Sequence, residues 1–469
     1  MLFLLPILSA ALLLAAFPPL ELSWCVYIAI IPLLVFIDRA KNTRTICIGA
    51  GVTGFLYGIF TLFPLASTNA WWWLEQSSLL FQHKELALYG FLALLALIGD
   101  VPFFILFSLA YKRIFAKDSP IRHWFVQILF VAACWTILEY ARSFVPGGIA
   151  WQELGISLAP QEYIRQFAHL VGIYGLGFFA VAMNICLYRW SLEWRRPRHF
   201  MASLLAFLAI WSYGYYRINA EPLGDPVRVA AIHSTLTTQE ESVGLVGFRY
   251  YEKAVETALA AGANLVVLPE NAVSFVVIDE NTMLPLGYEL PSSTIKAVYD
   301  KILGWSTAHP KKVFLIGLHS KKDEHLFNSV AYIEAGQLRQ LYHKRHLLPL
   351  SEGDFSSASV GGGQVDSFVF ETGLGRISPL ICSEVLYSDA TSRRASADLV
   401  TISGNDAIFG SDIVARRGRQ VTLLRAVQSG KYFIVSTKGL ESAIIDPLGE
   451  FINTSTDPSV VMADIRIRR

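Results

Sequence analysis

Charged residues are scarce in this chain. Only 16% of its 469 residues are Asp, Glu, Lys or Arg, and 53% are hydrophobic. A soluble domain usually carries about 25% charged residues, so the deficit argues against a wholly soluble protein and predicts that part of the chain lies in lipid. The net charge of +1 gives no basis for binding nucleic acid, and no nucleic-acid partner is predicted.

Cysteine is also scarce, and it is unevenly placed. Four of the five cysteines precede residue 187, and Cys382 is the only one in the rest of the chain. That second part cannot form a disulfide of its own, so the cysteine count neither supports nor excludes an oxidising compartment. Internal repeats and low-complexity tracts are absent as well.

Long apolar runs are confined to the first half of the chain. A helix needs about 20 apolar residues to cross the hydrocarbon core of a bilayer. We therefore predict a membrane domain of about seven transmembrane helices over residues 1–219, and a second domain over 220–469. The seven apolar segments lie at roughly 2–20, 22–37, 46–66, 86–110, 123–141, 167–188 and 200–216, of which the second and the last are short.

Lysine and arginine alternate between the predicted loops. Basic residues gather in loops on the cytoplasmic side of a membrane, so this asymmetry predicts a cytoplasmic amino terminus and an outward-facing second domain. In a bacterium the protein would lie in the inner membrane, with the second domain in the periplasm. The basic loops contain Arg39, Lys41, Arg44, Lys112, Arg113, Lys117, Arg122, Arg189, Arg195, Arg196 and Arg198, whereas the opposite loops contain Lys84, Arg142 and Arg165.

The second half alternates short β-rich runs with helical ones. This alternation, together with a hairpin around Ala335-Gly336, predicts a layered α/β domain. The expected helices cover 247–262 and 291–308. The expected strands cover 227–233, 265–268, 313–318, 329–333, 338–342, 376–381, 399–403, 433–437, 443–446 and 460–465.

Three chemically active side chains follow predicted strands. Glu270, Lys344 and Cys382 each come at or just after a strand end, where α/β folds place their chemistry. A glutamate can take the proton of a thiol, a lysine can stabilise an oxyanion, and a neighbouring cation or base can activate a cysteine as a thiolate. Each residue also has an ordinary structural explanation. A lone cysteine after a strand, for example, is usually a small buried hydrophobic residue.

The contexts of these residues resemble the nitrilase, or carbon–nitrogen hydrolase, superfamily over about residues 225–469. That resemblance implies an αββα sandwich with Glu270 as general base, Lys344 as oxyanion stabiliser and Cys382 as nucleophile. Glu352 would be a second, supporting glutamate. The matching motifs are Leu268-Pro269-Glu270, Tyr342-His343-Lys344, Glu352-Gly353, Ile381-Cys382-Ser383-Glu384, Asn405-Asp406-Ala407 and Arg425-Ala426.

A nitrilase-like domain behind a multi-helix membrane domain resembles the apolipoprotein N-acyltransferase family. The resemblance implies a phospholipid acyl donor, a cysteine thioester, and transfer to an amine on a lipoprotein. No metal or cofactor is expected. The residues that it implies for substrate binding or support are Ser383, Glu384, Asn405 and Trp151.

Several positions depart from that family. Ser383 follows the nucleophile where an aromatic residue is usual, and the long arm after Glu352 is shortened to about 353–363. These departures leave two alternatives open. One is a membrane-anchored amidase or hydrolase of the superfamily, and the other is a divergent relative such as the nitrilase-like conjugal transfer proteins.

Overall fold

The computed structural model divides by its internal contacts into two units. The first comprises Met1–Ala220 together with Ser411–Leu424, and the second comprises Glu221–Gly410 together with Arg425–Arg469. The structure describes residues 2–67, 84–144, 151–195, 197–220, 224–236, 245–287, 290–323, 325–347, 369–392, 394–408, 410–439, 441–455 and 459–467.

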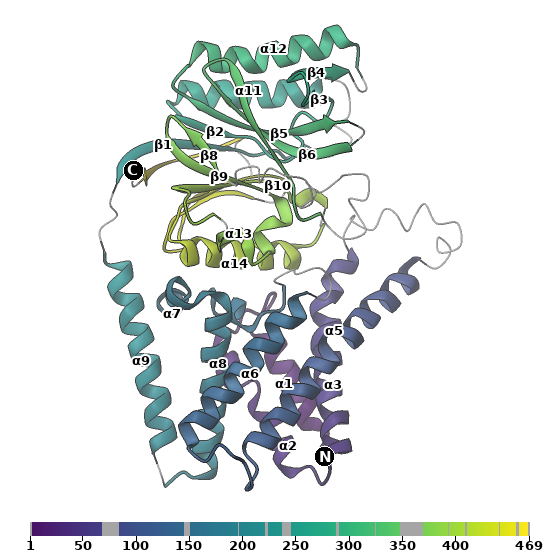
Figure 1. Cartoon of the computed structure of the whole chain (residues 1–469), viewed down its shortest axis with the longest axis vertical. Helices are drawn as coiled ribbons and strands as arrows, with labels where there is room; N and C mark the ends of the chain where they lie inside the picture. The colour runs from purple at the N-terminus through teal and green to yellow at the C-terminus, as the bar shows by residue number, and fades with distance from the viewer. Residues whose placement is uncertain are drawn as a thin grey trace. The chain divides into compact units, whose positions relative to one another are not determined.

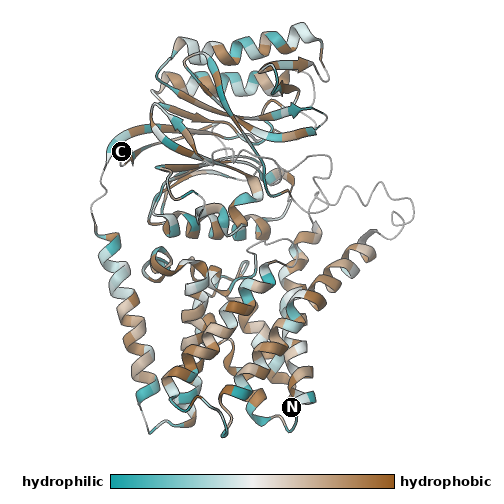
Figure 2. Cartoon of the chain, in the orientation of Figure 1, coloured by the Kyte–Doolittle hydropathy of each residue, from teal (hydrophilic) through white to brown (hydrophobic). Residues whose placement is uncertain are grey.

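The first unit is helical, and its helices are mostly hydrophobic (Figures 1 and 2). Within the described residues, four stretches are long and apolar enough to cross a membrane: Thr43–Ala66, Leu86–Ile114, Trp124–Ser143 and Ala168–Leu192. The α-helices before Glu221 are α1 (Leu4–Ala15), α2 (Ile31–Arg39), α3 (Thr43–Leu62), α5 (Lys84–Ile114), α6 (Trp124–Ser143), α7 (Glu162–Arg165), α8 (Ala168–Leu192) and α9 (Arg198–Ile218). The 3₁₀ turns are η1 (Ser23–Tyr27), η2 (Phe63–Ser67) and η5 (Leu154–Leu158).

The first two predicted spans form shorter helices than their apolar length suggested. The segment 2–20 gives the 12-residue α1, and the segment 22–37 divides into η1 and the nine-residue α2. Prolines at 18 and 19 follow α1, and a proline ring cannot supply the N–H that would continue a helix. The count of seven spans stays a prediction.

Two charged side chains inside the first unit, Arg142 and Asp100, are paired with one another. Arg142 on α6 donates to Asp100 on α5 with a nitrogen–oxygen distance of 2.8 Å, and both side chains are buried. The Glu139 carboxylate accepts a hydrogen bond of 2.7 Å from the Leu154 backbone N–H. Ionisable groups in an apolar environment are expensive unless they are paired. Arg142, which the sequence places in a loop, is therefore a structural cation of the helical unit.

The second unit contains two β-sheets. The first sheet has the order β14-β1-β2-β5-β3-β4, with β6 and β7 added through β5, and the second has the order β13-β12-β11-β10-β9-β8. The first sheet is built from β1 (Asp225–Ile232), β2 (Leu265–Val267), β3 (Val276–Asp279), β4 (Leu284–Gly287), β5 (Val313–Lys322), β6 (His325–Glu334), β7 (Gln337–His343) and β14 (Val460–Ile467). The second is built from β8 (Phe370–Thr372), β9 (Gly375–Ile381), β10 (Leu399–Asn405), β11 (Phe433–Lys438), β12 (Ser442–Ile445) and β13 (Phe451–Ser455).

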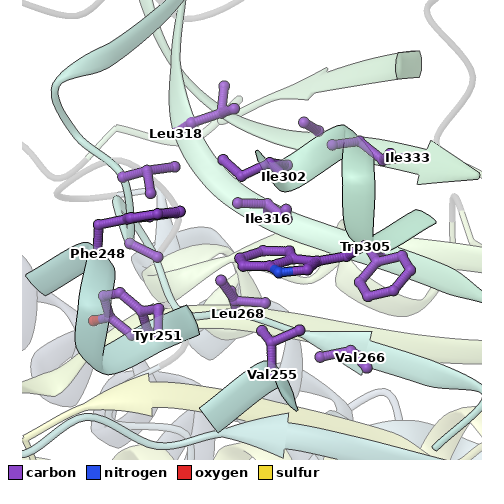
Figure 3. Close-up of a cluster of buried hydrophobic side chains, with 14 of the residues drawn as sticks. Phe248, Tyr251, Val255, Val266, Leu268, Ile302, Trp305, Ile316, Leu318 and Ile333 are labelled. Carbon is purple, nitrogen blue, oxygen red and sulfur yellow. The ribbon is translucent and has the colours of Figure 1, made fainter. Parts of the chain in front are cut away.

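Helices α11 (Val246–Ala260) and α12 (Ser292–Ala308) cover the outer face of the first sheet (Figure 1). Their apolar side chains, among them Phe248 and Trp305, pack on Leu268, Ile316 and Ile333 from the sheet in one buried cluster (Figure 3). Burying each such side chain contributes about 1.5–3 kcal/mol. The helices after the strand β8 are η6 (Cys382–Leu386), α13 (Asp389–Ser392), η7 (Asp406–Ile408) and α14 (Asp412–Ser429).

The central strands of the first sheet are buried on both faces. Along β5, Phe314 and Ile316 point into the cluster under the helices, whereas Val313 and Leu315 point into a second cluster that also contains residues of the second sheet. Successive side chains of a strand face opposite ways, so one apolar run serves two cores. The predicted αββα sandwich is thereby confirmed.

The predicted hairpin at Ala335-Gly336 is confirmed as the turn between β6 and β7. Both residues have positive φ values, 51° and 73°. Positive φ at both central positions defines the type I′ turn, whose twist matches that of the flanking strands. This tight turn sets the register in which β7 delivers Lys344 next to β6.

Candidate active site

Glu270 and Cys382 follow parallel strands, one in each sheet of the second unit, whereas Lys344 follows β7, which pairs antiparallel with β6. Strands β9 and β10 run in parallel, and Ile381 pairs with Ser403. The two sheets are tied together at this edge, because the Ser403 hydroxyl donates to the Leu268 carbonyl over 2.8 Å and the Glu270 N–H donates to the Gly404 carbonyl over 3.3 Å. The turn after β2 is therefore held against β10, the strand that pairs with β9.

Glu270 and Lys344 form a buried ion pair. The Lys344 Nζ lies 3.0 Å from the Glu270 Oε1, and the two residues are only 1% and 4% exposed. The side-chain amide of Asn328, on β6, donates to the same glutamate oxygen over 2.6 Å. The main-chain carbonyl of Asn328 accepts the Lys344 backbone N–H over 2.8 Å. A charge-assisted hydrogen bond in a dry environment is strong and geometrically specific. Asn328 thus fixes the positions of both ionised groups.

A glycine on β5 allows the Glu270 turn to approach the sheet. A Cβ atom at Gly317 would collide with the Pro269 carbonyl oxygen and would also press on the Glu270 Cα and the Asn271 N–H. Asn271 itself has a φ of 50°, in the left-handed region that costs energy for most side chains. The close approach and the strained turn together aim the Glu270 carboxylate at Lys344.

Cys382 occupies a strained turn between β9 and η6. Its φ is 49°, which is uncommon for a residue other than glycine and typical of positions held in place for function. The sulfur is within electrostatic range of Glu270, Lys344 and Asp406, and it accepts a hydrogen bond from the Asn405 backbone N–H. The structure therefore brings together all three residues of the predicted Glu–Lys–Cys constellation.

The surroundings of Cys382 disfavour a resting thiolate. Burial, and next the negative charge of Glu270, raise the pKa of the Cys382 thiol well above its usual value, and Lys344 offsets this only in part. The side chain is 7% exposed, so water cannot solvate a sulfur anion. A raised pKa favours the neutral thiol, which would then lose its proton to a base as it attacks. Glu270 is the candidate base for that transfer.

Glu384 connects the lysine segment to the cysteine segment. Its two carboxylate oxygens accept the Arg345 and Ile381 backbone N–H groups, each over 2.8 Å, and they also accept the Tyr342 hydroxyl over 2.9 and 3.0 Å. Arg394 donates to that hydroxyl over 2.6 Å. Burial and the charge of Glu384 raise the pKa of Tyr342 well above its usual value, so the hydroxyl remains a donor. Glu384 is a positioning residue for both segments.

Two predicted supporting residues, Ser383 and Asn405, carry buried polar atoms that lack partners within the described residues. These atoms are the Ser383 hydroxyl and the Asn405 side-chain oxygen. A buried polar atom without a partner costs about 1–3 kcal/mol, so such atoms call for a ligand. Next to them, burial raises the pKa of Asp406 to about 6, an effect that Thr437 opposes and Glu270 reinforces.

Two predicted site residues, Trp151 and Glu352, are not among the described residues of the second unit. Trp151 belongs to the first unit, where its ring is buried and its Nε1 donates to the Thr61 carbonyl over 3.4 Å. Glu352 lies outside the described residues, and its supporting role stays a prediction. In the part of the chain that is described, no group of three His, Cys, Asp or Glu side chains is arranged to hold a metal ion.

Sequence reasoning missed three residues that shape the site. Asn328 lies inside a strand, and nothing in its neighbourhood distinguishes it from other strand residues. Tyr342 directly precedes the His343-Lys344 pair, so its position was a usable signal. Arg394 reaches the site from a segment after α13, and only the fold shows that its guanidinium meets Tyr342.

Comparisons with known proteins agree with both halves of this description. Residues 9–186 match the family described as Apolipoprotein N-acyltransferase N-terminal domain, and residues 245–469 match the Carbon-nitrogen hydrolase family. The apolipoprotein N-acyltransferase of Geobacter metallireducens is 26% identical, with 95% of this chain and 85% of that protein covered. The enzyme of the same name from Azotobacter vinelandii is 27% identical over 84% and 76%.

Among solved structures, a mutant of the Nesterenkonia AN1 amidase from the nitrilase superfamily aligns with a TM-score of 0.40 and 17% identity. The alignment covers 52% of this chain and 92% of the amidase chain. The two family matches lie one behind the other, in the order of the helical unit and the sandwich unit. The chain is an apolipoprotein N-acyltransferase-like membrane protein of the carbon–nitrogen hydrolase superfamily.

Proposed function

We propose that this protein is a membrane-bound thiol acyltransferase. Cys382 takes an acyl chain from a phospholipid as a thioester and passes it to an amine, as the name of its relatives describes for apolipoproteins. The observation that supports this most directly is the buried Lys344–Glu270 ion pair within electrostatic range of the Cys382 thiol. It supplies a base for the thiol proton and a cation for the developing oxyanion.

The first half-reaction transfers the acyl chain to sulfur. As the Cys382 sulfur attacks the ester carbonyl of the donor, its proton moves to Glu270, and the charge on the carbonyl oxygen is stabilised by Lys344. The tetrahedral intermediate then expels the glycerol oxygen of the lipid, which takes the proton back from Glu270. The products are the thioester and a lysophospholipid, and Glu270 is again a carboxylate.

The second half-reaction transfers the acyl chain to nitrogen. A neutral amine attacks the thioester carbonyl, Glu270 accepts the proton that the nitrogen loses, and the Cys382 sulfur leaves and is reprotonated from Glu270. An amine attacks a thioester readily, because a thiol is a better leaving group than an alcohol. The near-complete burial of the sulfur limits attack by water, so the geometry favours transfer over hydrolysis.

The proposed location is the bacterial inner membrane, with the amino terminus in the cytoplasm and the sandwich unit in the periplasm. Two of the three cations that the sequence assigned to the outward-facing loops, Arg142 and Arg165, are buried within the first unit, so the charge asymmetry of the exposed loops is larger than predicted. A reporter enzyme that works only after export should be active when it is fused to the carboxyl terminus. Activity of a reporter that works only in the cytoplasm would contradict this orientation.

The acyl donor and the nucleophile are tested together by labelling. Full-length protein is incubated with a phospholipid that carries an alkyne-tagged acyl chain, and the labelled peptide is identified by mass spectrometry. We expect the label on the peptide that contains Cys382, and neutral hydroxylamine should remove it because it cleaves thioesters. The other four cysteines (Cys25, Cys47, Cys134 and Cys186) are internal controls. A label that resists hydroxylamine, or that spreads over all five cysteines, would contradict the proposal.

A further inference from the structure

Arg417 is a buried cation whose surroundings do not neutralise it. It lies in the Ser411–Leu424 stretch that belongs to the first unit, and it is only 2% exposed. Its guanidinium stacks on the rings of Phe17 and Trp151, at 4.8 and 5.3 Å from the ring centres, and one Nη donates to the Thr61 carbonyl over 3.5 Å. Within the described residues, no carboxylate oxygen comes within 4.0 Å of it to form an ion pair.

Polar atoms around this guanidinium are left without partners. The Arg417 Nε and the Thr61 hydroxyl oxygen are both buried, and neither makes a hydrogen bond within the described residues. Burial lowers the pKa of Arg417 to about 10, although Tyr57 and Glu153 act in the opposite direction. A buried charge without hydrogen-bonded compensation is costly. Arg417 and Thr61 are in contact through one Nη and the Thr61 carbonyl, and each carries an unused donor, one of them cationic, which together complement an anion.

The chemistry of the two donors selects an oxyanion with several oxygens. The guanidinium presents Nε and Nη in a planar fork that matches two oxygens of a phosphate or carboxylate, and a hydroxyl can bond a third oxygen. The phosphodiester of a phospholipid offers two anionic oxygens and two ester oxygens arranged tetrahedrally around one centre, whereas a carboxylate offers two oxygens in one plane. The arrangement therefore fits a phosphate group better than it fits a fatty-acid carboxylate.

The position of Thr61 along α3 indicates where that phosphate comes from. Thr61 is 18 residues beyond Thr43, the first residue of the helix, which places it about 27 Å along the axis. The hydrocarbon core of a bilayer is about 30 Å thick, so Thr61 lies near the depth of lipid headgroups at the second interface that α3 reaches. Its neighbours Phe60 and Phe63 are exposed, as suits aromatic side chains in contact with lipid.

We propose that Arg417 and Thr61 form a binding site for the phosphate group of a membrane phospholipid, with Trp151 and Phe17 holding the guanidinium in place. The inference rests on the proposed acyltransferase function, because it gives the lipid donor an anchoring point on the first unit. It also gives Trp151, which the sequence analysis selected as a substrate-binding or supporting residue, a defined role as a platform for the cation.

The test compares two acyl donors on the full-length protein in nanodiscs. One is a phospholipid, and the other is a p-nitrophenyl ester of the same fatty acid, which lacks a phosphate. Arg417→Gln should raise the half-saturating concentration of the phospholipid by about 10- to 100-fold, the range expected for losing hydrogen bonds to a charged group, and should leave labelling by the p-nitrophenyl ester unchanged. Arg416→Gln removes an exposed arginine from the same helix and is the matched control, with no expected change.

A second variant keeps the proposal open to refutation if Arg417→Gln does not fold. Thr61→Val replaces the hydroxyl by a methyl group of similar size and should raise the phospholipid requirement by about three- to tenfold. Equal phospholipid requirements in the wild type and both variants would overturn the site. If Arg417→Gln removes inhibition by inorganic phosphate while the phospholipid requirement stays constant, the site takes free phosphate and the lipid assignment is wrong. If neither donor labels Cys382 in the wild-type protein, the acyltransferase function itself is refuted.

Discussion

Replacing Cys382 by alanine is expected to reduce acyl transfer by at least about 10⁴-fold, because the covalent route is lost with the sulfur. The ion pair of Glu270 and Lys344 remains in the variant, but it has no thiol to deprotonate. The measurement is the initial rate of acyl transfer from a phospholipid to a lipopeptide amine in detergent or nanodiscs.

The fold of the Cys382→Ala variant should be preserved. Alanine and cysteine pay a similar cost for the left-handed φ of 49°, and the lost sulfur occupies a small volume at the edge of the core. Cys186→Ala, which changes another buried cysteine on α8, is the matched control and should keep full activity. Undiminished acyl transfer by Cys382→Ala would remove the nucleophile from the mechanism.

Glu270→Gln and Lys344→Met should both impair catalysis, but they should shift the thiol pKa in opposite directions. Each variant is expected to lose about 100-fold or more in acyl transfer, since one removes the base and the other removes the oxyanion partner. The negative charge of Glu270 raises the pKa of Cys382, and the positive charge of Lys344 lowers it. Removing the glutamate therefore lowers the pKa, and removing the lysine raises it further.

The rate at which iodoacetamide alkylates Cys382 in the free enzyme reports these pKa shifts directly. Only the thiolate reacts, so below the thiol pKa the rate of iodoacetamide labelling rises about tenfold for each pH unit. At pH 8 the wild-type Cys382 should react more slowly than free cysteine, because its raised pKa keeps it protonated. Glu270→Gln should react several times faster than the wild type, and Lys344→Met should react more slowly. The same change in both variants would show that accessibility, and not electrostatics, controls the thiol.

Much of the sandwich unit was predictable because its strands are short apolar runs that end in polar or turn-forming residues. The run that ends at Ile381 and the turn at Ala335-Gly336 both gave element boundaries within a residue or two. The hairpin of β3 and β4 was missed, since each strand has four residues and β4 contains Pro285, which is unfavourable in a sheet interior. Periodicity over four residues is too short to identify a strand.

The helical unit was harder to predict, because apolar length does not show how a segment packs. The segment 2–20 has the composition of a span, yet its helix ends at Ala15. Arg142 has the sequence context of a loop cation, and its pairing with Asp100, 42 positions earlier, follows only from the contact of α5 with α6. Hydropathy records the cost of each residue in lipid but carries no information about its partner.

The identities of the candidate catalytic residues were predictable, whereas their electrostatics were not. Glu270, Lys344 and Cys382 were found because carboxylate, ammonium and thiol groups stood at strand ends with family-like neighbours. The sign of the thiol pKa shift depends on burial and on which charge lies nearer, and neither quantity is written in the local sequence. Asn328 acts through one amide across a strand pair, so its role is visible only in three dimensions.

The burial of Cys382 has a consequence for the lifetime of the acylated intermediate. In the proposed two-step reaction, the acylated protein has to wait for its second substrate, and each molecule of water that reached the carbonyl during this wait would waste a lipid chain. Cys382 is only 7% exposed, and such burial would give the loaded intermediate a long lifetime. The protein can then turn over at the slow pace at which membrane-tethered acceptors arrive by lateral diffusion.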